Sequence, residues 1–149
     1  MSPQVDIQNA STLPVPKNPE LTRWICAAVS LANGPANAEI SVRLVDEPEM
    51  ATLNLHYRNK TGSTNVLSFP SDLPTELNLA LLGDIVICAP VVHAEAKAQH
   101  KSEDAHWAHM AIHGTLHLLG YDHVDAADAD VMESLETAVM QSLNYPCPY

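Results

Sequence analysis

The sequence predicts an α+β domain with a small mixed β-sheet packed with about five helices. Segments with the two-residue alternation of strands are interleaved with segments of helical periodicity up to about residue 90, and only helical periodicity follows. This order of elements is typical of a small sheet covered by helices. The length of 149 residues is close to the commonest size of one domain, so we expect residues 1–149 to form a single domain.

Four short segments are predicted to be strands. Residues 4–8 and 40–45 alternate polar and apolar side chains, as half-buried strands do. Residues 66–69 are mostly apolar and end at Pro70. Residues 85–88 are continuously apolar, which predicts a central strand buried on both faces. Two polar segments between the strands are predicted to be loops, at 58–65 and 71–80.

Five helices are predicted from apolar residues at helical spacing, at residues 20–33, 47–57, 91–100, 103–119 and 127–143. Asp46 and Ser102 are suited to cap the second and fourth helices at their N-termini. Pro90 can begin the third helix, because proline is tolerated in the first turn. Gly120 is expected to end the fourth helix. Apolar side chains at four-residue steps predict that the last helix has a core-facing stripe of Val131, Leu135, Val139 and Leu143.

The charge distribution restricts how the chain can bind a polyanion. The net charge is -11, and residues 102–149 contain eight acidic residues and no lysine or arginine. A protein that binds nucleic acid along its phosphate backbone usually has a basic face. Any polyanion must therefore be held by the few cations before residue 102 or by a metal. The last, acidic helix is expected to be exposed and solubilising.

The composition also predicts the compartment. No apolar run is long enough for a membrane-spanning helix, and the first residues do not resemble a secretory signal. The three cysteines, Cys26, Cys88 and Cys147, are far apart and fit free thiols in a reducing compartment better than disulfides. We therefore expect a cytoplasmic protein that does not associate with a membrane.

The segment from His113 to His123 has the spacing of a metal site. Residues four apart in a helix lie about 40° apart on one face, so the imidazoles of His113 and His117 can bind one ion. Gly120 permits a positive φ that breaks the helix, and His123 can then approach as the third ligand. Three neutral nitrogen ligands leave one coordination position for water. We therefore predict one zinc ion per chain at the end of a central helix, in a metal-dependent hydrolase.

The spacing His-x-x-x-His-x-x-Gly-x-x-His is also that of the metzincin proteases. In those proteases a glutamate follows the first histidine and acts as general base, whereas this chain has Gly114. The difference argues against peptide hydrolysis but not against phosphodiester cleavage. His109 is expected to be packed or to lie behind the ligands. Asp122 is assigned to the turn, and its alternatives are to orient a histidine or to act as a base.

Three blocks of sequence carry a family resemblance. The first is Tyr-Arg-Asn-Lys at residues 57–60, followed by Thr-Asn-Val-Leu-Ser-Phe-Pro at residues 64–70. The second is Leu-Gly-Asp-Ile-Val-Ile at residues 82–87, and the third covers residues 106–123. With these blocks, and with its length and element order, essentially the whole chain resembles the YbeY family of bacterial endoribonucleases.

The resemblance implies a metal-dependent, single-strand-specific endoribonuclease that acts in small-subunit (16S) rRNA 3′-end maturation and in ribosome quality control. It implies that the zinc ligands are His113, His117 and His123 and that Arg58 is the functionally important arginine. The implied partners are single-stranded rRNA and the small ribosomal subunit with its proteins. Physically, the Arg58 guanidinium can donate two hydrogen bonds to phosphate oxygens; the alternative for it is a structural salt bridge.

Three functions remain open from the sequence. In the endoribonuclease, zinc activates water or binds the scissile phosphate, Arg58 neutralises charge, and the nucleophile is water or the RNA 2′-hydroxyl. A ribosome-assembly factor would have a structural zinc, with His109 or Asp122 as a fourth protein ligand. A metzincin-like zinc protease is disfavoured by Gly114. Asp84, at the start of a strand, is a candidate base but is expected to be a structural acceptor.

Overall fold

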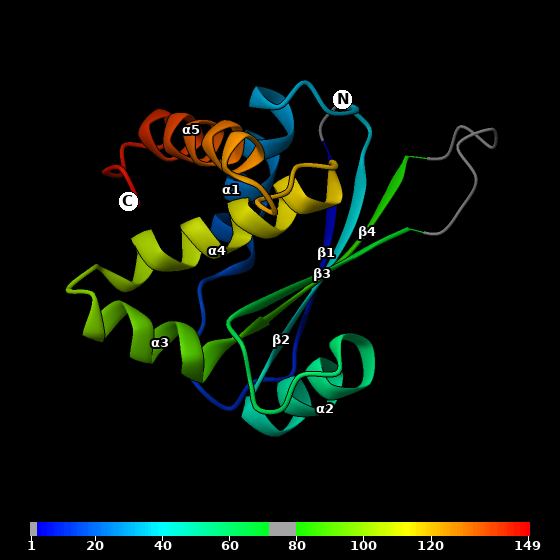
Figure 1. Cartoon of the computed structure of the whole chain (residues 1–149), viewed down its shortest axis with the longest axis vertical. Helices are drawn as coiled ribbons and strands as arrows, with labels where there is room; N and C mark the ends of the chain where they lie inside the picture. Colours follow the sequence, from blue (N-terminus) through cyan, green and yellow to red (C-terminus); the bar gives the residue numbers. More distant parts are fainter. Residues whose placement is uncertain (1–2, 72–79) are drawn as a thin grey trace.

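The computed structural model describes residues 3–71 and 80–149, in which five helices and four strands occur (Figure 1). In chain order these are β1 (Gln4–Asn9), α1 (Asn18–Leu31), β2 (Glu39–Val45), α2 (Glu47–Arg58), β3 (Val66–Pro70), β4 (Leu81–Cys88), α3 (Ala89–Ala98), α4 (Glu103–Leu118) and α5 (Ala126–Ser142). The predicted α+β class with a mixed sheet is confirmed. The last strand begins at Leu81, four residues earlier than its apolar run predicts, and most of the predicted loop 71–80 lies outside the described residues.

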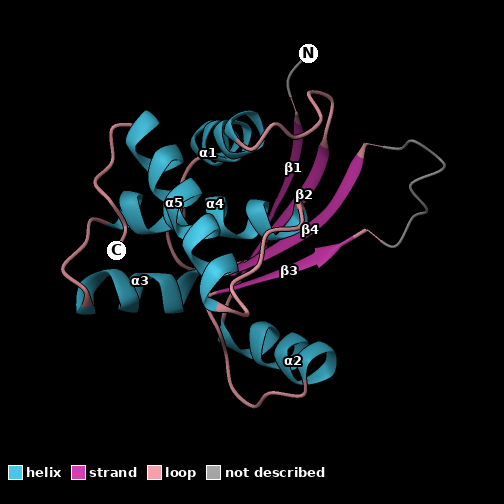
Figure 2. Ribbon diagram, turned by 45° about the horizontal axis from the view of Figure 1, so that its top comes forward, coloured by secondary structure: helices cyan, strands magenta, loops and turns pink. Residues whose placement is uncertain are grey.

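The four strands form one sheet in the order β1-β2-β4-β3. β1, β2 and β4 are parallel, whereas β3 pairs antiparallel with β4. β4 is therefore central, as its continuous apolar run predicts. Figure 2 shows β1 and β3 at the two edges of the sheet, and the edge formed by β3 borders the site described below.

The helices cover the two faces of the sheet unequally. α1, α4 and α5 lie together on one side of the sheet, and α2 lies apart from them (Figure 1). The larger core is on the side of α1 and α4, where it receives alternate residues of the central strands, among them Ile40, Val42, Leu44, Ile85 and Ile87. A smaller core under α2 consists of Val45, Met50, Leu67, Val86 and Cys88.

α4 lies so close to the sheet that Gly114 has no room for a side chain. A Cβ atom at this position would be 2.9 Å from Cγ2 of Ile85 and 3.3 Å from Oγ of Ser68. The Ser68 hydroxyl donates a hydrogen bond of 2.9 Å to the Gly114 carbonyl, which ties the helix to β3. The close approach fixes where the C-terminal end of α4 lies relative to the edge of the sheet.

The buried face of α5 differs from the predicted stripe. The helix buries Met132, Glu136, Val139 and Met140, whereas Val131 is 56% exposed. Val139 is buried as predicted, and Leu135 and Leu143 are partly buried against the core, so the predicted stripe is wrong at Val131. It also left out Met132, Glu136 and Met140, because it counted only apolar side chains at four-residue steps. A carboxylate occupies the middle of the buried face instead.

The two predicted caps have different outcomes. The Ser102 hydroxyl accepts a hydrogen bond of 3.1 Å from the Ala105 backbone N–H and caps α4 as expected. Asp46 stands at the N-cap position of α2, but its carboxylate does not cap the helix. It accepts hydrogen bonds from the side chains of Ser11 and Thr12 at 2.6 and 2.7 Å, and these hydrogen bonds lower the pKa of Asp46.

Two predictions from composition can be compared with the structure. The three cysteines are free, as expected. Across residues 3–71 and 80–149, no helix has both the length and the apolarity required to span a bilayer.

Candidate metal centre

The three histidines predicted as ligands meet at the C-terminal end of α4. One ring nitrogen from each of His113, His117 and His123 lies within 4.8 Å of the other two. The Nε2 atoms of His113 and His117 are 3.1 Å apart. Two nitrogens bound to a tetrahedral zinc at about 2.0–2.1 Å would be roughly 3.3 Å apart. The arrangement can therefore hold a metal ion; that the ion is zinc stays a prediction.

The turn after α4 brings His123 back toward the helix. Gly120 has a φ of 99°, in the left-handed region that favours glycine. The backbone N–H of Gly120 donates to the His117 carbonyl at 3.1 Å, and that of Tyr121 donates to the Leu116 carbonyl at 3.0 Å, which is the Schellman pattern of a helix C-terminus. The Asp122 carboxylate accepts a hydrogen bond of 2.7 Å from the His123 backbone, so it has the predicted role in the turn.

The cluster leaves a coordination position open. Within the described part of the chain, no fourth histidine, cysteine or carboxylate joins the three histidines. The Asp122 carboxylate is 4.0 Å from Nδ1 of His123, and His109 is directed to a different partner. Neither candidate for a fourth ligand is therefore in place, which weakens the structural-zinc alternative.

Burial favours the neutral form of His117, one of the three predicted ligands. Burial lowers the pKa of His117, and the neighbouring His113 and His123 lower this pKa further. A metal ligand must be a neutral imidazole, so the same environment that disfavours protonation of His117 favours metal binding.

A carboxylate that the sequence analysis missed supports the cluster from behind. Glu136 of α5 is 1% exposed, and its Oε1 accepts a hydrogen bond of 3.0 Å from Nδ1 of His113. Its Oε2 accepts hydrogen bonds from Nε2 of His109 and, at 2.7 Å, from the Tyr149 hydroxyl. Burial raises the pKa of Glu136, but the three hydrogen bonds outweigh burial and lower this pKa to about 2. The sequence did contain a signal for this residue. Glu136 lies at helical spacing from Met132, Val139 and Met140, so a charged residue falls on the buried face of α5.

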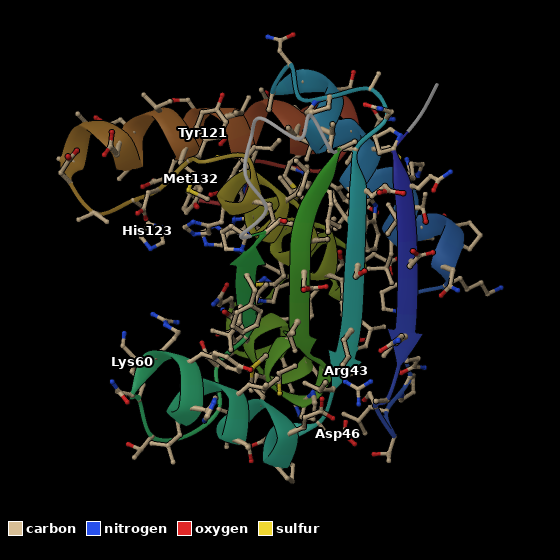
Figure 3. The ribbon with its side chains drawn as sticks, turned by 90° about the vertical axis from the view of Figure 1, so that its right-hand side faces the viewer. Arg43, Asp46, Lys60, Tyr121, His123 and Met132 are labelled. Atoms are coloured by element: carbon tan, nitrogen blue, oxygen red, sulfur yellow. The ribbon has the colours of Figure 1, made fainter. Side chains whose placement is uncertain are left out.

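A cleft of about 750 Å³ opens in front of the three histidines. One wall is the edge strand β3, and the other is the turn from Gly120 to Val124. Arg58, the last residue of α2, lines the same cleft and has no ion-pair partner in the described residues, so the salt-bridge alternative is not observed. Lys60 and His123 face the same open side of the molecule (Figure 3). The cleft thus combines the candidate metal centre with an unpaired guanidinium.

Asp84 is not brought to the histidines. It lies on the α2 side of the sheet, in a second cleft of about 880 Å³ that Asp6, Arg43 and Glu49 also line. Nor does its carboxylate accept a hydrogen bond within the part of the chain described. Asp122 is the carboxylate that lines the histidine cleft. Strand alternation places Asp84 on the other face of the sheet from the histidines, which disfavours its alternative role as a base there, and the expected role as a structural hydrogen-bond acceptor is not observed among the described residues.

The sequence matches proteins of one known family. A family model described as Endoribonuclease YbeY matches residues 6–144. The protein named Endoribonuclease YbeY in Cellvibrio japonicus is 50% identical over 147 residues, which cover 98% of this chain and 82% of that protein. A protein of the same name in Pseudomonas syringae pv. tomato is also 50% identical, over 98% of this chain and 87% of its own length.

A solved structure supports the fold. The solution structure of TM1509 from Thermotoga maritima superimposes with a TM-score of 0.58 and covers 95% of this chain and 92% of that chain. The two sequences are 24% identical, so the likeness bears on the fold alone.

Proposed function

The chain belongs to the YbeY family of endoribonucleases, and from this premise we propose that it is a zinc-dependent endoribonuclease that cleaves single-stranded RNA. The observation that carries the proposal is the cluster of His113, His117 and His123, which has an open position and shares its cleft with Arg58, a cation with no ion pair among residues 3–71 and 80–149. A guanidinium in this setting, next to a candidate metal centre, suits a substrate with a phosphate group.

The proposed mechanism assigns a task to each group in the cleft. The three histidines hold the ion, and bound zinc supplies Lewis acidity toward phosphate oxygens. Arg58 donates hydrogen bonds to the non-bridging oxygens and stabilises the charge that develops during cleavage. Asp122 is the carboxylate available to accept a proton in the cleft, in addition to its contact in the turn.

The proposed substrate is the 3′ end of the small-subunit (16S) rRNA, in maturation and ribosome quality control in the cytoplasm. The family resemblance supports this choice. We further propose that productive RNA binding requires the small ribosomal subunit and its proteins. The net charge of -11 supports this proposal, because so acidic a chain is expected to bind free RNA weakly.

The protease alternative has less support than the nuclease. The metzincin glutamate would stand at residue 114, where even a Cβ atom would meet Ile85. Its side chain would therefore be directed at the sheet and could be accommodated only by a shift of Ile85 or of α4. The assembly-factor alternative would need a fourth ligand that the described residues do not supply.

The proposal is tested by cleavage of a single-stranded RNA fragment with the 16S 3′-end sequence. We expect the wild type to cut it, His117→Ala to lose both zinc and cleavage, and Arg58→Ala to keep zinc but cut at least about 100-fold more slowly. Arg23→Ala is the matched control, because Arg23 pairs with Glu20 on the surface of α1.

Equal cleavage by all four preparations would indicate a contaminating nuclease and would favour the assembly factor. The ends of the product then distinguish the nucleophiles. A 2′,3′-cyclic phosphate indicates the RNA 2′-hydroxyl, whereas a 5′ phosphate indicates water.

A further inference from the structure

The ring of His113 is held from both sides. Its Nε2 lies 3.1 Å from Nε2 of His117, and its Nδ1 lies 3.0 Å from Oε1 of Glu136 on α5. A carboxylate can only accept hydrogen bonds, so the proton of a neutral His113 is on Nδ1. The lone pair of Nε2 is then free and directed at the position that a shared ion would occupy.

Glu136 itself is fixed by two further donors. Nε2 of His109 and the Tyr149 hydroxyl both contact Oε2, and the Tyr149 ring packs edge-on against His109 with the ring centres 5.3 Å apart. The Nδ1 atom of His109 is buried and has no hydrogen-bond partner among the residues that the structure describes. This is consistent with a proton on Nε2, because a buried acceptor is left unsatisfied more readily than a buried N–H.

The charge on Glu136 has no cation beside it in the described part of the chain. Its buried carboxylate lies within ion-pair distance of His109 and His113, which carry a positive charge only when protonated. No lysine or arginine among the described residues contacts it. Three hydrogen bonds compensate for the lost hydration of this carboxylate, and each donor is held in a defined orientation. The carboxylate therefore has one position that satisfies all three donors, and this position defines the plane of the His113 ring.

We propose that Glu136 is a positioning residue for the metal centre, which fixes the tautomer and the ring orientation of His113 while His109 and Tyr149 hold it in place. The part of this inference that concerns zinc rests on the proposed function. Carboxylates behind metal-bound histidines typically contribute about 10- to 100-fold to metal affinity.

The first test uses the protein without metal. Long-range ¹⁵N–¹H NMR of the histidine rings reports which nitrogen of His113 is protonated. We expect Nδ1–H in the wild type and in Glu133→Ala, and a mixture of tautomers in Glu136→Ala. Glu133 is a control on the same helix, because its carboxylate makes no hydrogen bond or ion pair among the described residues and acts on the Tyr149 hydroxyl through its charge alone. A wild-type His113 with its proton on Nε2 would overturn the proposal.

The second test measures zinc affinity by competition with a chelator. We expect the dissociation constant to rise about 10- to 100-fold in Glu136→Ala and to stay within about 2-fold in Glu133→Ala. Glu136→Gln keeps one acceptor oxygen and should recover part of the affinity. Tyr149→Phe removes one donor to Oε2 with little risk to the fold, and should weaken binding by about 2- to 5-fold, within the range for an outer hydrogen bond.

The two proposals fail in different ways. Wild-type affinity in a folded Glu136→Ala protein would overturn the positioning role and leave the nuclease untouched. A wild type that binds no zinc would contradict the proposed function, and the tautomer of His113 would still decide whether Glu136 fixes the ring.

Discussion

The two halves of α4 each present a pair of histidines about one helical turn apart, in different surroundings. His106 and His109, in the first half, are 3% and 7% exposed, and each contacts a carboxylate, Glu95 or Glu136. His113 and His117, in the second half, reach the cleft. All four lie along one stripe of the helix, as the 100° rotation per residue requires. Spacing thus aligns the four histidines on one side of α4, whereas their position along the helix determines that His113 and His117 line the cleft.

The first half of α4 uses its histidines to connect elements. Nε2 of His106 lies 2.9 Å from Oε1 of Glu95 on α3, and the Asn65 side chain donates to the same carboxylate at 3.1 Å. Asn65 stands directly before β3, and its carbonyl accepts a hydrogen bond from the Cys88 backbone at 2.8 Å. His106 therefore helps to hold α3, α4 and the start of β3 together. Of the three residues His106, Glu95 and Asn65, Asn65 is the one that lines the cleft.

The largest expected difference is in metal binding by the two halves. We expect His113→Ala to raise the zinc dissociation constant by at least about 100-fold, because about 10–16 kcal/mol of binding free energy is shared by four ligands in structural sites. His106→Ala should leave zinc affinity within about 3-fold but lower the free energy of unfolding by about 2–4 kcal/mol, through a cavity and a lost buried hydrogen bond. Chelator competition and urea denaturation measure the two effects. Equal loss of zinc in both variants would remove the distinction between the halves.

A smaller effect is expected where the second half meets the sheet. Gly114→Ala gains up to about 1 kcal/mol of helix propensity, but its new Cβ would lie 2.9 Å from Ile85. Overpacking of this kind costs about 1–3 kcal/mol, so we expect a net loss of about 1 kcal/mol in the free energy of unfolding. Urea denaturation of the metal-free protein measures it. A more stable variant would mean that the sheet yields and that helix propensity dominates.

A further effect, spread over a range of pH, is the dependence of stability on pH, to which both halves contribute. Burial lowers the pKa of His106, although its hydrogen bond with Glu95 opposes this, and burial also lowers the pKa of His117. A histidine whose pKa is lower in the folded state contributes stability above about pH 6.5, and this stability is lost as the pH falls toward the folded pKa. Each group contributes at most about 1.4 kcal/mol per pH unit.

Urea denaturation of the metal-free protein between pH 7.5 and 5.5 should therefore show falling stability. The slope should be shallower in His106→Ala, which lacks one of these groups. An unchanged slope in that variant would show that His106 is not protonated on unfolding in this range.

The sequence predicted those features of the site that are local in the chain. The three histidines, Gly120 and the Ser102 cap all lie within one helix and the turn after it, where spacing determines geometry. Glu136 could not be found in this way, because it lies 23 residues beyond His113 on another helix. The role of Asp84 also depends on the fold, since one step along a strand changes the face of the sheet. Arg58 was identified by resemblance, and only the packing of α2 against the sheet places it in the cleft.

The hydrogen bond between His113 and Glu136 has a consequence for biosynthesis. The groups of the proposed centre come from three segments, the end of α2, α4 with its turn, and α5, so none of these segments can form it alone. A chain that has been translated only as far as the turn after α4, through His123, already contains the three histidines and Arg58 but lacks the carboxylate that orients His113. The centre is therefore completed only when α5 has docked against α4 and Glu136 has reached His113.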